Sequence, residues 1–344
     1  MRVLKLEKKN SKKLFDVLSE FGEIWSPMKK GDSFTYQKIE RQKDFVFHHE
    51  VARTILPEKK MLIPQKFSTL SFNSKKFEKP NEEIPTKIIF GIYNCGISAL
   101  NILDEFYTTD FIDADYHKRR EKLIIVGVSC IADEYCFCDK TNTNNVEKGY
   151  DIFFADLHDY YLVWIGTSKG DDIIRVGEDM GIFDETIPND VTDKFAEYRK
   201  RNYESFCNDI DLEGTTDLME LSHDALFWKE LGDKCLSCGQ CTMVCPTCTC
   251  YNVIDEIALN KDSGQRIRYW DSCLFKDFSL TAGEHNFRAA RSERLKLWYT
   301  HKLKAFIGKF GAPSCVGCGR CIVTCPVDIN IKTVAEKLKK KRVA

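Results

Sequence analysis

Two copies of one cysteine motif occur in the C-terminal third of the chain. They read Cys235-x2-Cys238-x2-Cys241-x3-Cys245-Pro and Cys315-x2-Cys318-x2-Cys321-x3-Cys325-Pro. With this spacing, a tight loop directs three thiolates at one [4Fe–4S] cluster, and the fourth thiolate ligates the other cluster of the pair. The motifs therefore predict two [4Fe–4S] clusters. The first would take Cys235, Cys238, Cys241 and Cys325, and the second would take Cys315, Cys318, Cys321 and Cys245.

The residues around these cysteines fit the same interpretation. Gly239 and Gly319 would let backbone N–H groups come close to the sulfurs, and Pro246 and Pro326 would end each loop. A pair of zinc knuckles is the alternative. Zinc normally takes two Cys-x2-Cys pairs per ion, however, rather than two sets of four cysteines followed by proline. We therefore expect iron–sulfur clusters here.

Four cysteines in the N-terminal half would suffice for a third [4Fe–4S] cluster. Cys95 and Cys130 each follow a short apolar run that is typical of a buried strand, and Cys136 and Cys138 come shortly afterwards. The carboxyl ends of parallel strands form the edge of an open α/β sheet where ligands bind. The spacing is not a standard cluster signature, and buried cysteines also serve as ordinary core residues. The third cluster is therefore a hypothesis, with that alternative open.

The other cysteines have no place in these three sets. Cys248, Cys250 and Cys273 could bind a metal ion together with His285, or they could pack around the clusters, and we expect packing. Cys207 is isolated in the sequence. The sequence contains no glycine-rich phosphate loop and no complete G-x-G-x-x-G. We therefore expect that this chain binds neither flavin nor nicotinamide.

The segments around the cysteines alternate between strand and helix patterns. We expect strands at 3–6, 87–94 and 122–129, hairpins at 23–39 and 151–170, a helix at 11–22 capped by Ser11, and helices at 97–107 and 192–206. The strand–helix–strand order between 87 and 129 predicts a βαβ unit and hence a parallel pair of strands. The segment 60–90 is rich in proline and lysine, and we expect it to run over the surface.

The expected fold class is α+β with two domains. Residues 1–225 would form an α/β domain that has a partly parallel sheet and carries the third cluster site. Residues 226–344 would form an α-helical, ferredoxin-like domain with two clusters. This expectation rests on the 69 residues that separate Cys245 from Cys315 and that include helical patterns such as 290–308.

Length and composition are typical of a globular protein without a membrane span. Of 344 residues, 43% are hydrophobic, and no run of about eighteen uncharged apolar residues occurs. The first residues lack the apolar core of a signal peptide, so we expect a cytoplasmic location, where 16 cysteines would bind metal rather than form disulfides. Residues 226–344 hold 20 Lys+Arg and 11 Asp+Glu, but no basic patch with stacking aromatic residues. Nucleic-acid binding is not expected.

Several strings in both halves of the chain carry a family resemblance. The C-terminal half contains CLSCGQCTMVCPTCTC, YWDSC, AGEHNFR and the second motif with CGRC. The N-terminal half contains IIFGIYNCGISALNILDEFY, GVSCIADEYCFC and DIFFADL, so the resemblance spans nearly the whole chain. With these strings the sequence resembles the iron–sulfur β subunit of cytosolic [NiFe]-hydrogenases of the sulfhydrogenase type. An iron–sulfur component of anaerobic sulfite reductase is similar to the same family.

This resemblance implies an electron-transfer subunit of an anaerobic oxidoreductase complex. Its partners would be a ferredoxin-reductase-like subunit that carries FAD and separate catalytic subunits, with soluble ferredoxin as a further candidate. The chain would relay single electrons between the flavoprotein and an external carrier or another subunit, and it would not be catalytic alone. Two alternatives stay open: the corresponding component of an anaerobic sulfite reductase or of another flavin-based complex, and an enzyme with its own substrate site at the N-terminal cluster.

Overall fold

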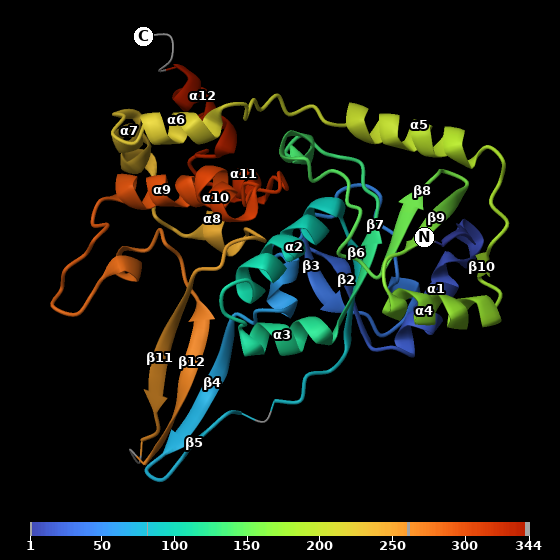
Figure 1. The fold of residues 1–344 in the computed structure, drawn as a ribbon, viewed down its shortest axis with the longest axis horizontal. Coiled ribbons are helices and arrows are strands. Elements are labelled where there is room, and N and C mark those ends of the chain that lie inside the picture. Colours follow the sequence, from blue (N-terminus) through green and yellow to red (C-terminus); the bar gives the residue numbers. More distant parts are fainter. Residues whose placement is uncertain (1, 81, 260–261, 341–344) are drawn as a thin grey trace.

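The computed structural model describes residues 2–80, 82–259 and 262–340. Its largest element is an eight-stranded sheet with the order β10-β1-β9-β8-β7-β6-β2-β3 (Figure 1). The strands are β1 (Val3–Glu7), β2 (Glu23–Lys30), β3 (Ser33–Lys38), β6 (Lys87–Ile92), β7 (Leu123–Val128), β8 (Ile152–Asp156), β9 (Tyr160–Ile165) and β10 (Phe183–Asp184). The pairs β2–β6, β6–β7 and β7–β8 are parallel, whereas the others are antiparallel. The predicted partly parallel sheet is therefore confirmed.

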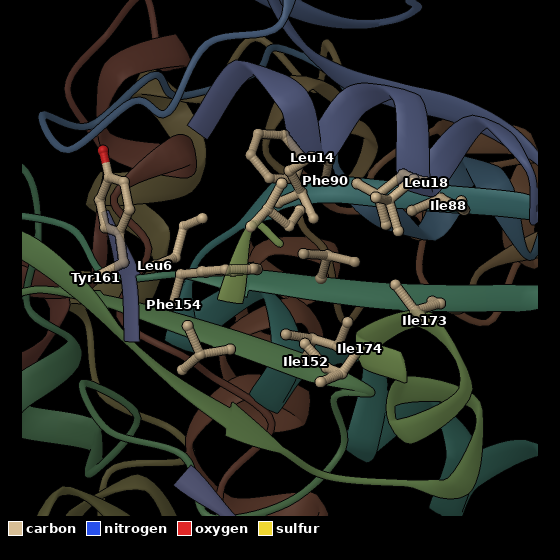
Figure 2. Close-up of a cluster of buried hydrophobic side chains, with 14 of the residues drawn as sticks. Leu6, Leu14, Leu18, Ile88, Phe90, Ile152, Phe154, Tyr161, Ile173 and Ile174 are labelled. Carbon is tan, nitrogen blue, oxygen red and sulfur yellow. The ribbon is translucent and has the colours of Figure 1, made fainter. Parts of the chain in front are cut away.

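Helices cover both faces of this sheet. On one face, Leu14 and Leu18 of α1 (Leu14–Ser19) and Ile173 of α4 (Ser168–Asp179) meet Phe90 and other strand residues (Figure 2). On the other face lie α2 (Asn94–Thr108), which contributes Leu103, α3 (Ala114–Glu121) and α5 (Val191–Glu204). Because both faces are covered, every residue of the apolar strand β7 is buried, as parallel strands usually are.

The first helix begins later than the sequence pattern indicated. A 3-10 helix (Lys8–Lys13) precedes α1, and the hydroxyl of Ser11 inside it donates to the carbonyl of Lys8 at 2.7 Å. The prediction that Ser11 caps the helix was therefore wrong, because its side chain satisfies a preceding carbonyl instead of a following N–H. The expected buried side chains of this segment, such as Leu14 and Leu18, are buried.

A second, antiparallel sheet joins distant parts of the chain. Its order is β11-β12-β4-β5, with β4 (Lys66–Asn73), β5 (Phe77–Glu78), β11 (Tyr251–Ile257) and β12 (Ser263–Trp270) (Figure 1). The prediction that 60–90 runs over the surface did not foresee the strands β4 and β5, and it was wrong for Met61, Leu62 and Ile63, which are buried. The expectation of helices between the two cysteine motifs also missed β11 and β12. All residues of β11 are exposed, so its apolar side chains are not buried. The domain boundary at residues 225 and 226 stays a prediction, although β4 and β12 pair across it.

Short helices surround the two cysteine motifs. They are α6 (Thr215–Leu221), α7 (Phe227–Lys234), α8 (Gln240–Met243), α9 (Arg291–Thr300), α10 (Ile307–Phe310), α11 (Arg320–Thr324) and α12 (Ile331–Lys340), and a π-helix, His301–Ala305, continues α9. Trp228, Leu295 and Trp298 form the core of this region together with the buried Cys235. Across the described ranges, every helix is too short or too polar to cross a membrane.

Candidate metal centres

The two cysteine motifs adopt the same local structure. In each motif a loop carries the first two cysteines and enters a short helix, α8 or α11, that carries the third. The turn occurs at Gly239 in one motif and at Gly319 in the other, with φ values of +73° and +71°. Glycine adopts this left-handed conformation readily, because it has no Cβ. The repeat in the sequence is thus also a repeat in structure.

The first group of thiols lies beside α8. It consists of Cys235, Cys238, Cys241 and Cys325. Burial, together with repulsion from the neighbouring thiolates, raises the pKa of Cys241 well above its ordinary value. The backbone N–H of Ser237 points at the Sγ of Cys235 at 3.4 Å, an interaction of the kind that tunes cluster potentials. Cys238 is exposed whereas Cys235 is buried, so this group reaches the protein surface.

The second group of thiols lies beside α11. It consists of Cys245, Cys315, Cys318 and Cys321. Burial raises the pKa of Cys315 to about 12 and that of Cys318 to about 11. Cys245 borders both groups, since its charge acts on Cys241 as well as on Cys321. Which of these neighbouring thiols ligates which cluster stays a prediction.

The four N-terminal cysteines also lie together. Cys95 occupies the first turn of α2, directly after β6, rather than preceding the helix as expected, and Cys130 follows β7. Cys136 and Cys138 lie on the next loop and are buried with Cys95 in one cluster of side chains. The hydrogen bond from Cys138 lowers the pKa of Cys95, although burial opposes this. The third group is therefore at the edge of the sheet where the sequence placed it.

The loops of the second and third groups are in direct contact. The N–H of Phe137 donates to the carbonyl of Gly317 at 2.8 Å, and the thiol of Cys138 donates to the same oxygen at 3.6 Å. A Cβ on Gly317 would lie 2.4 Å from the carbonyl oxygen of Phe137, so a larger residue does not fit here. The charges of Cys318 and Cys95 also act on each other. The second group therefore lies between the first group and the third group.

Arg53 ties the second and third groups together. Its guanidinium donates to the carbonyl of Cys318 at 3.0 Å and to the Sγ of Cys136 at 3.3 Å. It also forms a two-pronged ion pair with Asp133, with distances of 2.6 and 2.7 Å. A planar guanidinium suits this task because its donors diverge in a fixed geometry.

A buried ion pair lies beside the second group of cysteines. The guanidinium of Arg320, which is adjacent to Cys321, donates to Glu58 at 3.0 Å and to the carbonyl of Thr54 at 3.1 Å. Tyr36 donates a further hydrogen bond to Glu58 at 3.2 Å. Both charged side chains are almost fully buried, so loss of either partner would leave an uncompensated charge in the interior.

The chemistry of these thiols fits iron–sulfur clusters. Burial raises the pKa of Cys130 and Cys321 well above the ordinary range. A bound metal ion would remove the proton from such a thiol. Among the described residues, no group of three or more His, Cys, Asp or Glu side chains is arranged around one metal ion. A zinc ion needs its thiolates about 2.3 Å from one point, whereas a [4Fe–4S] cluster spreads them over four iron atoms.

Cys248, Cys250 and Cys273 lie near the first and second groups and not with His285. The thiol of Cys248 contacts Cys245, and that of Cys250 contacts Cys273. His285 is exposed, and its ring packs against Phe287. Cys248 and Cys273 belong to the C-terminal hydrophobic core, which agrees with the packing role expected for them, and the isolated Cys207 is exposed.

A cavity of about 480 Å³ adjoins the third group of cysteines. Asn94 and Tyr198 line it, and both are close to this group: Asn94 precedes Cys95, and the charge of Cys130 adds to burial in raising the pKa of Tyr198. Aromatic side chains of β8, β9 and α5 contribute to the remaining wall, together with polar residues such as Asn145 and Glu147. Such a cavity at the carboxyl edge of a parallel sheet is a common place for a small ligand.

Two comparisons with known proteins agree with this arrangement. Residues 234–329 match the model of a family described as a 4Fe-4S dicluster domain. The chain is 33% identical over 340 residues to sulfhydrogenase 2 subunit beta of Pyrococcus furiosus, covering 98% of this chain and 99% of the relative. The chain belongs to the sulfhydrogenase β-subunit family. The resemblance seen in the sequence is thereby confirmed. The dicluster match covers the first and second groups, while the third group lies within the full-length match of this family.

Five charged residues around the thiols were not predicted from the sequence. They are Arg53, Glu58, Lys59, Lys302 and Arg320. Only Arg320 lies within a cysteine motif, and the others reach the site from distant segments, so their spacing carries no signal. Lys302 gives no such signal either, because His301 precedes it and Lys304 follows closely.

Proposed function

We propose that this chain is the electron-transfer iron–sulfur subunit of a cytoplasmic hydrogenase-type complex. The observation that carries the proposal is the series of three four-thiol groups, which runs from the exposed Cys238 to the edge of the large sheet. Membership in the sulfhydrogenase β-subunit family supports it. Clusters bound at these groups would supply single-electron transfer.

The residues of this chain would have distinct tasks in that function. The first group, Cys235, Cys238, Cys241 and Cys325, would hold one [4Fe–4S] cluster, and the second, Cys245, Cys315, Cys318 and Cys321, another. The third group, Cys95, Cys130, Cys136 and Cys138, would hold a third. Arg53 and Gly317 would keep the second and third groups together, since both contact the two loops. Partial or complete burial of every thiol in the three groups except Cys238 would limit the access of water to the clusters.

The proposal includes partners, because this chain would not be catalytic alone. A ferredoxin-reductase-like subunit would carry FAD, which we propose is not bound by this chain, and another subunit would carry the catalytic metal site. A soluble ferredoxin would be a further partner. The relative is a sulfhydrogenase subunit, which favours hydrogenase over sulfite reductase as the catalytic unit.

The cavity beside the third group supports a second candidate function. In that case the chain would act on a small substrate of its own next to Cys95, where about 480 Å³ of space is lined by both aromatic and polar side chains. Turnover by the isolated, iron-loaded chain would favour this candidate. Turnover only in the presence of the partner subunits would favour the electron-transfer role.

Iron and sulfide analysis of this chain, separated from its metal-bearing partner subunits, tests the main proposal. Three clusters predict about twelve iron atoms in this chain, and two clusters predict about eight. A Cys138→Ser variant should lose about four iron atoms and one electron paramagnetic resonance (EPR) signal. Cys207→Ser is the matched control, because Cys207 is exposed and outside the three groups. Unchanged iron and spectra in Cys138→Ser would refute the third cluster, and absence of iron would refute the whole proposal.

A further inference from the structure

Two lysines are buried next to the second group of cysteines. Lys59 lies on the 3-10 helix Glu58–Met61, Lys302 lies on the π-helix His301–Ala305, and each is 3% exposed. Their positive charges act on each other unfavourably. In the part of the chain that the structure describes, neither forms an ion pair with a carboxylate: Lys59 donates to the carbonyl of Cys248 at 2.8 Å, and Lys302 donates to the hydroxyl of Thr247 at 2.9 Å. Two cations buried together are costly unless an anion balances their charge.

A network of hydrogen bonds fixes the position of Lys302. The hydroxyl of Thr247 accepts from Lys302, donates to the carbonyl of Ser314 at 2.6 Å and lies 3.3 Å from the Sγ of Cys245. The hydroxyl of Ser314 in turn donates to the carbonyl of His301 at 2.8 Å. One carbonyl of the π-helix therefore has a polar partner, and short π-helical segments are frequent at functional sites. This network holds the Lys302 ammonium beside the thiol of Cys245.

The position of Lys59 is fixed by a different set of contacts. Its ammonium lies 4.3 Å from the centre of the Trp270 ring, a favourable cation–π distance. The carboxylate of the preceding residue, Glu58, forms its ion pair with Arg320 at 3.0 Å and, among the described residues, none with Lys59. Lys59 and Lys302 thus approach the segment between Cys245 and Cys248 from two unrelated parts of the fold.

We propose that Lys59 and Lys302 are the counter-ions of the second cluster, and that they raise its reduction potential. This inference rests on the proposed function. Four thiolates and a cluster carry net negative charge, which the two ammonium groups would balance. Reduction adds one electron, supplied in a titration by dithionite, and makes the cluster more negative. Nearby fixed positive charge therefore stabilises the reduced form more than the oxidised form.

The test compares three variants of the full chain in its purified complex. Lys302→Met removes the charge with similar length, Lys302→Arg keeps the charge, and Lys304→Met is the matched control. Lys304 lies on the same π-helix, but its ammonium pairs with Glu220 at the surface. The readouts are iron and sulfide per chain and the midpoint potential of each EPR signal. Lys302→Met should lower the equilibrium constant for reduction of one cluster by about tenfold, which corresponds to about 59 mV for one electron.

Each outcome supports or overturns the proposal. A lower potential for one cluster in Lys302→Met, with Lys302→Arg and Lys304→Met close to the parent protein, supports it. Loss of about four iron atoms from Lys302→Met alone also supports it, since the cluster then requires the charge. Unchanged or higher potential, or equal loss of iron from Lys302→Met and Lys302→Arg, overturns it. Absence of cluster iron from the parent protein would instead refute the proposed function.

Discussion

Replacing Gly317 with alanine probes the contact between the second and third groups of cysteines. Gly317 has φ +62°, and an added Cβ would lie 2.4 Å from the carbonyl oxygen of Phe137 and 2.5 Å from the backbone nitrogen of Cys138. Both atoms belong to the backbone, so no side-chain rotation relieves the clash. The loop that carries Cys136 and Cys138 would have to move away from the loop that carries Cys318.

The expected cost can be divided into three parts. The left-handed backbone costs alanine about 1–2 kcal/mol. Overpacking against Phe137 adds about 1–3 kcal/mol. Loss of the 2.8 Å hydrogen bond from Phe137 to Gly317 adds about 1 kcal/mol. The sum is about 3–6 kcal/mol, a large part of the stability of an ordinary domain.

Gly311→Ala is the matched control for this substitution. Gly311 has φ +72°, and its added Cβ would meet no atom within 4 Å. It therefore shares only the backbone strain, about 1–2 kcal/mol. The assay is anaerobic urea unfolding together with iron per chain, and Gly317→Ala should also lose about four iron atoms from the third site. Equal unfolding free energies and equal iron content in the two variants would refute the reasoning.

Three other substitutions and treatments have defined outcomes. Asp113→Asn keeps the cap of α3 but removes the ion pair with the buried Arg268 of β12. It should lower the free energy of unfolding in urea at pH 7 by about 3 kcal/mol, more than loss of a surface ion pair would. A loss below about 0.5 kcal/mol would contradict this. Cys238→Ser should lose about four iron atoms from the exposed end of the series, while retained iron would exclude Cys238 as a ligand. Removal of iron by a chelator should speed amide exchange in 235–250 and 315–325, because buried thiols and lysines lose their counter-charge; unchanged exchange would show that the clusters do not stabilise these loops.

Much of the parallel sheet could be predicted because its signals are local. The runs that became β6 and β7 are apolar throughout, and a helical pattern separates them, so a parallel pair follows from chain connectivity. The predicted start of the first helix at Ser11 was wrong, because the Ser11 hydroxyl donates to the carbonyl of Lys8 within a 3-10 helix. The strands β4 and β11 also escaped prediction. Both strands pair with the distant β12, and all residues of β11 are exposed, so no local pattern of buried apolar residues marks it.

The cysteine motifs show the same division between local and long-range information. The sequence alone determined that two loops each present three thiols, because ligand spacing and the glycine turn are local properties. It also placed Cys95 and Cys130 at one edge of the sheet, since both follow parallel strands. Only the tertiary structure decided that the second and third groups meet at Gly317, and that Lys59 and Lys302 are buried beside Cys245. These contacts join residues far apart in the chain, and their energies depend on burial, which no spacing of residues encodes.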